Sequence, residues 1–304
     1  MDMNRLRALR ELARCGTMAA AAEALSLTPS AVSQQIAHLE EEAGVALTER
    51  RGRGVRLTPA GEALVGHAER LLVVLDEAKS ELALLRREVA GELRVAAFPS
   101  IASAILPETI KALRASTPRL RLAVEEMEPV DGLAALGSWR ADIALIDHLS
   151  LQMDRRHGGF GLVPLAEDSL HVLLPDTHPL AGRASLTVAD LRHESWAMDA
   201  AASSFGEFVR DLCRKAGFEP RMDVRAQGFE VVSAMVSAGC AVTVVPGLRL
   251  IRPVPGTRAV RLRPDGGRRI SVAFRRGERA HPAVTVFIDA IVRVAARLCP
   301  RPAG

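Results

Sequence analysis

The chain has 304 residues, a formal net charge of +4, a pI near 9.2 and 48% hydrophobic residues. This length can hold one large core or two to three smaller ones, and the composition is typical of a globular protein. No apolar stretch approaches the roughly 20 residues of a membrane span, and the N-terminus has no hydrophobic signal segment. We therefore expect a cytoplasmic protein.

Residues 19–61 carry the most informative pattern. A small-residue helix is predicted over 19–25, and Thr28 and Pro29 suit the N-cap and first position of a second helix after a three-residue turn. The second helix has an apolar face, formed by Val32, Ile36 and Leu39. Its opposite face carries short, uncharged side chains: Ser30, Ser33, Gln34 and Ala37. Such a face suits a major groove, so the pattern predicts a helix-turn-helix that binds DNA.

A short hairpin is predicted next, over residues 47–57. It turns at Gly52 and Gly54 and carries four arginines: Arg50, Arg51, Arg53 and Arg56. We expect Ser30, Ser33 and Gln34 to contact base edges and Pro29 to help position them. We expect Arg53 and Arg56 to contact the backbone or the minor groove. Each piece alone favours a helical hairpin with a solvated charged loop, since short helix pairs are common; the ordered combination favours DNA binding.

A long helix is predicted over residues 59–90, capped by Thr58, begun by Pro59 and closed by Gly91. Apolar residues recur in it at alternating steps of four and three: Leu64, Ala68, Leu71, Leu75, Ala78, Leu82, Leu85 and Val89. A 3.5-residue repeat of this length favours a coiled-coil seam between two copies of the chain. The alternative is an amphipathic helix lying on its own domain, but we expect no core within residues 1–57 to be large enough to bury it.

From Glu92 onward, strands alternate with helices in two successive sets, and two late strands near 258–263 and 269–275 lead to a final helix over 282–298. Repeated βαβ units predict parallel sheets, and the late return predicts two lobes joined by two crossovers. The fold class is therefore α/β, doubly wound. We place a winged helix-turn-helix in 1–58, a linker helix in 59–90 and a two-lobed domain in 92–304. Lobe I is expected at about 92–163 and 267–304, and lobe II at about 164–266.

A ligand cleft is expected at the carboxyl ends of the strands, between the lobes. The first strand delivers Ser100, Ile101 and Ala102 to the start of a helix, where N–H groups and the Ser100 hydroxyl could hold a ligand acceptor. Ser100 could equally be a simple N-cap. Other strand ends contribute Glu128, Asp147, Asp199, Ser203 and Phe229. The two aspartates predict an acidic lining that disfavours an anionic effector and suits an amine-bearing or neutral one.

Residues 19–61 resemble the winged helix-turn-helix of LysR-type transcriptional regulators. The resemblance rests on Ala21-Ala22-x-x-Leu25, Pro29-Ser30-Ala31-Val32-Ser33-x-Gln35-Ile36-x-x-Leu39-Glu40, Gly44-Val45-x-Leu47, Arg50 and Gly54-x-x-Leu57-Thr58-x-x-Gly61. Met18 replaces the family's usual aromatic residue and Thr48 its usual Phe, and both are expected to pack under the wing. The resemblance implies a periplasmic-binding-protein-like effector domain, an effector cleft at the Ser100 segment, and a homodimer or homotetramer. It leaves RNA polymerase as a further candidate partner.

Two alternatives remain beside an effector-controlled regulator. The C-terminal part could be only an oligomerisation scaffold, or the chain could be a solute-binding protein, which would need an export signal. No enzyme is predicted, because no nucleophile elbow, phosphate loop or dinucleotide motif occurs. The cysteines (Cys15, Cys213, Cys240 and Cys299) and the histidines lack metal-ligand spacing, so we expect no metal and no cofactor. A redox pair of Cys213 with Cys240, as in peroxide-sensing members of the family, is disfavoured; Cys240 is predicted to be buried.

Overall fold

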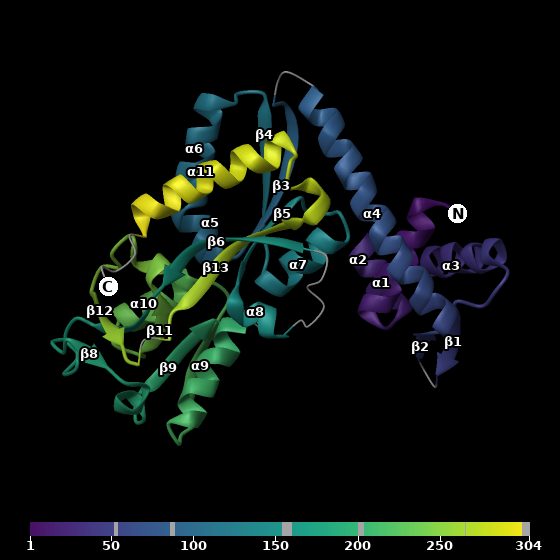
Figure 1. Cartoon of the computed structure of the whole chain (residues 1–304). Coiled ribbons are helices and arrows are strands. Elements are labelled where there is room, and N and C mark those ends of the chain that lie inside the picture. Colours follow the sequence, from purple (N-terminus) through teal and green to yellow (C-terminus); the bar gives the residue numbers. More distant parts are fainter. Residues whose placement is uncertain (52–53, 86–88, 154–159, 200–203, 265, 300–304) are drawn as a thin grey trace.

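The structure is a computed structural model that describes residues 1–51, 54–85, 89–153, 160–199, 204–264 and 266–299. An N-terminal helical module and a long helix lie beside a larger α/β body built of two lobes (Figure 1). Within these described ranges, no helix combines the length and the apolar character needed to cross a bilayer.

The N-terminal module is a three-helix unit with a two-stranded wing. Its elements are α1 (Met3–Cys15), α2 (Met18–Leu25), α3 (Pro29–Ala43), β1 (Thr48–Arg51) and β2 (Gly54–Leu57). The Thr28 hydroxyl accepts a hydrogen bond from the Ala31 N–H at 3.2 Å, so α3 begins as the sequence predicts. Leu12, Ala22, Val32 and Ile36 form part of a common core. The predicted winged helix-turn-helix fold is confirmed.

The long helix is α4 (Pro59–Leu85), and it presents two different stripes. One stripe is buried within the chain, against α1 of the module and η4 (Arg276–Glu278) of the body: Ala68, Leu72, Asp76 and Ser80. Four residues of the predicted heptad lie on the other stripe and are exposed (Leu71, Ala78, Leu82 and Leu85), whereas heptad residue Ala68 belongs to the buried stripe. The core of residues 1–57 was expected to be too small to bury the helix, and the structure adds packing surface from the body, which lies outside that range. Gly91 does not close the helix; it begins a strand.

Lobe I is built on a five-stranded sheet in the order β4-β3-β5-β13-β6. The strands are β3 (Gly91–Ala97), β4 (Leu120–Glu126), β5 (Ile143–Asp147), β6 (Phe160–Asp168) and β13 (Arg268–Arg275). The helices are α5 (Pro99–Ala104), α6 (Leu106–Ser116), α7 (Pro129–Gly137), α8 (His148–Met153) and α11 (Pro282–Leu298). One core cluster packs α11 residues such as Phe287 and Ile291 against Val95, Leu145 and Val272 of the sheet.

Lobe II has two smaller sheets, β11-β7-β12-β8 and β10-β9, joined by a bridge between Trp196 and Val242. Its strands are β7 (Leu170–Pro175), β8 (Ser185–Leu186), β9 (Ser195–Asp199), β10 (Arg221–Ala226), β11 (Thr243–Pro246) and β12 (Thr257–Leu262). Its helices are η2 (Val188–Leu191), α9 (Ser204–Lys215), α10 (Phe229–Ser237) and η3 (Gly247–Leu250). Trp196 is completely buried in the core.

The prediction of purely parallel sheets was wrong. β3 is parallel to β4 and β5, but β13 runs antiparallel to β5 and β6, and β7 runs antiparallel to β11 and β12. The strands β6 and β13 leave and re-enter lobe I, and their directions follow from those crossings. The helical segment that follows β3 is divided at Ile105 into α5 and α6, and α7 ends at Gly137.

Trp139 lies where the N-terminal module meets lobe I. Its backbone has a φ of +60°, and the guanidinium carbons of Arg7 and Arg10 on α1 each lie 4.5 Å from its ring centroid. A third, Arg275 at the end of β13, lies at 5.4 Å. Arg10 also donates a hydrogen bond to the carbonyl of Gly137. These contacts join α1 to the α/β body of the same chain.

Candidate functional site

The first candidate surface is the exposed face of α3. Its exposed residues include the four predicted to contact DNA, namely Pro29, Ser30, Ser33 and Gln34, whereas Val32 and Ile36 on the other face are buried. Figure 1 shows α3 on the side of the module that lies away from the α/β body. This face is therefore open along its length, and its hydroxyl and amide groups can act as donors or acceptors at base edges.

The wing is fastened to α3 through one carboxylate. Oε1 of Glu40 accepts hydrogen bonds from the N–H groups of Leu47 and Thr48, both at 2.8 Å, and from the Thr48 hydroxyl at 2.9 Å. Thr48 therefore adds a polar contact where packing was expected, whereas Met18 packs on the core cluster of the module. Arg56 on β2 is exposed, and Arg53 lies outside the described residues.

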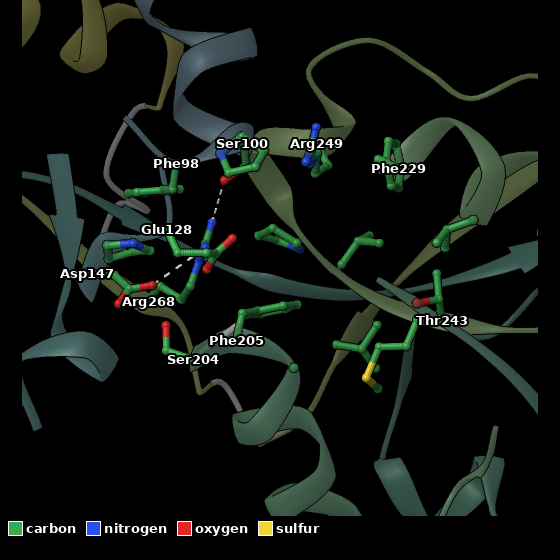
Figure 2. Close-up of a pocket in the computed structure, with 18 residues that line it drawn as sticks. Phe98, Ser100, Glu128, Asp147, Ser204, Phe205, Phe229, Thr243, Arg249 and Arg268 are labelled. Atoms are coloured by element: carbon green, nitrogen blue, oxygen red, sulfur yellow. Dashed lines mark hydrogen bonds and ion pairs between the residues drawn. The ribbon is translucent and has the colours of Figure 1, made fainter. Parts of the chain in front are cut away.

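The second candidate site is a cavity of about 90 Å³ between the two lobes. Figure 2 shows its lining side chains, which converge from both lobes. Lobe I and the crossovers contribute Phe98, Ser100, Glu128, Asp147 and Arg268; lobe II contributes Met198, Ser204, Phe205, Phe229, Val232, Thr243, Val244 and Arg249. The walls are mostly apolar with a few converging polar groups, which is typical of a small-molecule site.

Arg268, the first residue of β13, joins the two sides of this cavity. Its Nη2 donates to Oδ2 of Asp168 at 2.7 Å and to the Ser100 hydroxyl at 2.8 Å, and its Nη1 lies 3.6 Å from Oδ2 of Asp147. The rings of Phe98 and Phe205 lie 5.0 and 5.1 Å from its guanidinium carbon. A buried cation with two carboxylate neighbours and two aromatic faces is held rigidly in place.

The residues predicted on α5 separate into two groups. Ser100 lines the cavity, and its hydroxyl is engaged by Arg268. Ile101 is completely buried in the lobe I core, and Ala102 packs against the same core, so neither lines the cavity. The reason is the helical period: when the first turn of α5 points Ser100 at the cleft, the next two residues turn toward the sheet.

Three other predicted residues, Glu128, Asp147 and Phe229, do line the cavity. Ser203 and the side chain of Asp199 lie outside the described residues. The expectation of a simply acidic lining was wrong, because Arg268 and Arg249 line the same cavity as Asp147 and Glu128. The guanidinium groups of Arg268 and Arg249 add positive charge to the lining that the predicted carboxylates do not account for.

Sequence reasoning missed Arg268, Arg249, Phe98 and Phe205. It took site residues from the carboxyl ends of strands that it assumed to be parallel. Because β13 is antiparallel to β5, the amino end of β13 lies at this edge of the sheet, and Ile270 pairs with Asp147. The glycine pair Gly266-Gly267 before Arg268 indicates where the strand begins. It does not indicate whether the strand is parallel or antiparallel to its neighbours.

One cysteine differs from expectation. Cys240 is exposed, not buried, because it follows α10 in the turn at Gly239, which has a φ of +75°. Cys213 is buried, and burial raises the pKa of its thiol to about 11. Across the described ranges, no group of three or more His, Cys, Asp or Glu side chains could hold a metal ion.

Comparison with known proteins covers both parts of the chain. Residues 3–62 match the family model described as "Bacterial regulatory helix-turn-helix protein, lysR family", and residues 86–296 match the "LysR substrate binding domain". Transcriptional dual regulator GltC of Bacillus subtilis (strain 168) is 27% identical over 246 residues, which is 81% of each chain.

Solved structures agree in fold along nearly the whole length. Full-length OxyR C199D from Pseudomonas aeruginosa is 26% identical, with a TM-score of 0.65 over 99% of this chain and 96% of that one. Full-length CbnR, solved in complex with its target DNA, is 27% identical, with a TM-score of 0.56 over 97% of this chain and all of that one.

Proposed function

Because the chain belongs to the LysR family of transcriptional regulators, we propose that it reads operator DNA with the exposed face of α3 and senses a small molecule in the cavity between its lobes. In this division, residues 1–58 bind DNA, residues 59–90 link and dimerise, and residues 92–304 bind the effector. A protein that acts on operator DNA would work in the cytoplasm, and contact with RNA polymerase would follow at the promoter.

The DNA half of the proposal assigns roles to residues of α3 and the wing. Ser30, Ser33 and Gln34 contact base edges, and Pro29 positions them at the start of the helix. Arg56 and Arg53 contact phosphates or the minor groove. The observation that supports this most is that all four α3 residues are exposed on the side opposite the buried Val32 and Ile36.

The effector half assigns the cavity to ligand binding rather than to catalysis. Ser100, Glu128, Asp147 and Phe229 line it, together with Arg268 and Arg249. None of its described lining residues is a His or a Cys, so within the part of the chain that the structure describes the cavity has no Ser–His or Cys–His pair. We assign Ile101 and Ala102 a supporting role behind Ser100.

A thermal-shift screen of metabolites with the full-length protein tests the effector half. Ligands that bind the folded state raise its melting temperature by mass action. We expect at least one metabolite to stabilise the wild type and to change its affinity for DNA, with both responses blunted in Ser100→Ala. A Ser100→Ala variant that keeps the wild-type dose response places the site elsewhere. If no metabolite stabilises the wild type, the C-terminal part is only a scaffold.

A further inference from the structure

Within the described residues, three polar atoms of side chains that line the interlobe cavity are buried without a hydrogen bond: Oδ2 of Asp147, the Ser204 hydroxyl and Nε of Arg268. Asp147 ends β5 and is 1% exposed; its Oδ1 accepts from the Ser150 N–H at 3.0 Å, but its Oδ2 has no hydrogen-bond partner among the residues that the structure describes. Ser204 begins α9 and is 8% exposed, and within the same described ranges its hydroxyl has no partner either. Both residues line the cavity, and Figure 2 shows both in the part of the cavity where Arg268 lies.

Arg268 does not satisfy Asp147. Its Nη2 is engaged by Asp168 and Ser100, and its Nη1 stays 3.6 Å from Oδ2 of Asp147, which is beyond hydrogen-bond distance. The carboxylates of Asp147 and Asp168 therefore share the guanidinium of Arg268. Together these three side chains carry a formal charge of −1. At the wall of the cavity, Glu128 and Arg249 have opposite charges and add no net charge. The part of the cavity around Asp147 and Arg268, which we call its inner end, therefore has a net charge of −1.

The chemistry of these atoms restricts what they can receive. A carboxylate oxygen only accepts hydrogen bonds, so a ligand that satisfies Oδ2 of Asp147 must donate one. The net charge of −1 favours a cationic donor over a neutral one, because an ion pair in a site of low dielectric is stronger than in water. An ammonium group has three donors and can address both Asp147 and the Ser204 hydroxyl. A carboxylate ligand would lie beside a like charge at this end.

Resting on the proposed effector function of this cavity, we propose that its ligand carries a primary ammonium group that donates to Asp147 and Ser204. The rest of the ligand lies along the apolar wall formed by Met198, Phe205, Val232 and Val244. A simple alkylamine and the α-ammonium group of an amino acid share this chemistry. Arg249 lies on the Phe229 side of the cavity, with its guanidinium carbon 5.1 Å from that ring, and distinguishes the two by favouring a carboxylate.

A matched set of probes on the full-length protein tests this proposal. The probes are n-butylamine, L-2-aminobutyrate, butyrate and 1-butanol, which share a four-carbon skeleton, together with the twenty common L-amino acids. Melting temperature is measured across millimolar concentrations of each probe. We expect ammonium-bearing probes to stabilise the wild type and butyrate and 1-butanol to have no effect. A response to L-2-aminobutyrate that exceeds the response to n-butylamine identifies an amino acid as the source.

Three variants separate binding from folding. Asp147→Asn keeps the size of the side chain and an Oδ1 acceptor for Ser150, and we expect it to weaken ammonium binding at least tenfold. Ser204→Ala removes only the hydroxyl and is expected to weaken it severalfold. Asp131→Asn, on the exposed surface of α7 and outside the cavity lining, is the matched control and is expected to respond as the wild type does.

The outcomes distinguish this proposal from the proposed function. If ammonium probes stabilise Asp147→Asn as well as the wild type, or if no ammonium probe stabilises the wild type, the ammonium assignment is overturned. A carboxylate or alcohol probe whose effect is lost in Ser100→Ala but kept in Asp147→Asn also overturns it, while leaving the cavity as the effector site. Binding of operator DNA is measured in the same preparations and does not depend on either result.

Discussion

The indole Nε1 of Trp139 donates a hydrogen bond to Oδ1 of Asp76 at 3.3 Å, which joins lobe I to the long helix α4. The other oxygen of Asp76 lies 3.3 Å from Nε of Arg275. One turn further on, the Ser80 hydroxyl donates to the carbonyl of Gly277 at 2.9 Å. Because Arg7 and Arg10 of α1 lie against the same indole ring, the pose of the DNA-binding module is fixed to lobe I through Trp139.

Replacing Asp76 by Ala should loosen this junction. The indole N–H would lose a buried acceptor and Arg275 would lose its ion pair with Asp76, although Arg275 keeps Asp142 and Glu278 as partners. We expect a loss of about 1–3 kcal/mol of unfolding free energy, typical of an unsatisfied buried group. Hydrogen exchange should rise in α4 and η4. Lys79→Ala, which removes a half-exposed partner 3.7 Å from Asp76, should cost less than about 1 kcal/mol and leave the exchange unchanged.

The adjacent residues Leu71 and Leu72 test whether the exposed stripe of α4 forms a dimer interface. Leu71 is 51% exposed in the protomer and belongs to the predicted heptad, whereas Leu72 is 2% exposed and packs within the chain. Leu71→Glu should put a charge into the interface between two copies and dissociate them without unfolding the protomer. Leu72→Glu should instead lower the melting temperature. Sedimentation velocity at micromolar concentration separates the two; a wild-type monomer would refute the seam.

Thr48 makes a polar contact at the base of the wing, and its loss should be measurable. Thr48→Val keeps the shape of the side chain but removes the hydroxyl that donates to Glu40. We expect a loss of about 0.5–1.5 kcal/mol of stability in the DNA-binding module, because the two backbone bonds to Glu40 remain. Glu40→Ala removes all three bonds and should cost more. Urea denaturation of both variants measures the two losses of unfolding free energy. No loss in Thr48→Val would mean that the hydroxyl contributes nothing.

The cysteines should differ in reactivity according to their burial. Only a thiolate is alkylated quickly, and a pKa of about 11 leaves Cys213 almost entirely protonated at pH 8. Iodoacetamide should therefore modify exposed Cys240 first, and Cys213 should react only in denaturant. Peptide mass spectrometry after timed labelling measures both sites. Fast labelling of native Cys213 would show that this part of α9 opens readily.

The N-terminal module could be predicted from the sequence because its signals are local. The N-cap Thr28, the helix start at Pro29 and the apolar spacing of Val32 and Ile36 all lie within nine residues, and each determines structure at its own position. The structure therefore has the same helix with the same buried face.

The cavity could be predicted only in part because its key residue is placed by non-local pairing. Arg268 reaches Ser100 across 168 residues of sequence, and it does so because β13 runs antiparallel to its neighbours. The Trp139 junction has the same character, since α1, α4 and β13 each supply one side. No local pattern at 139 marks such a position.

Selection of DNA in vitro by the full-length protein, followed by sequencing, tests the central claim of operator reading most directly. The wild type should enrich a motif of two related half-sites, since two modules of a dimer bind together. Gln34→Ala should lose about 1–3 kcal/mol of preference at selected base pairs. Arg56→Ala should keep the motif but bind all DNA more weakly, with a smaller salt dependence. A wild-type protein that enriches no motif, or a Gln34→Ala variant that enriches the wild-type motif unchanged, would contradict the assignment of α3 as the reading helix.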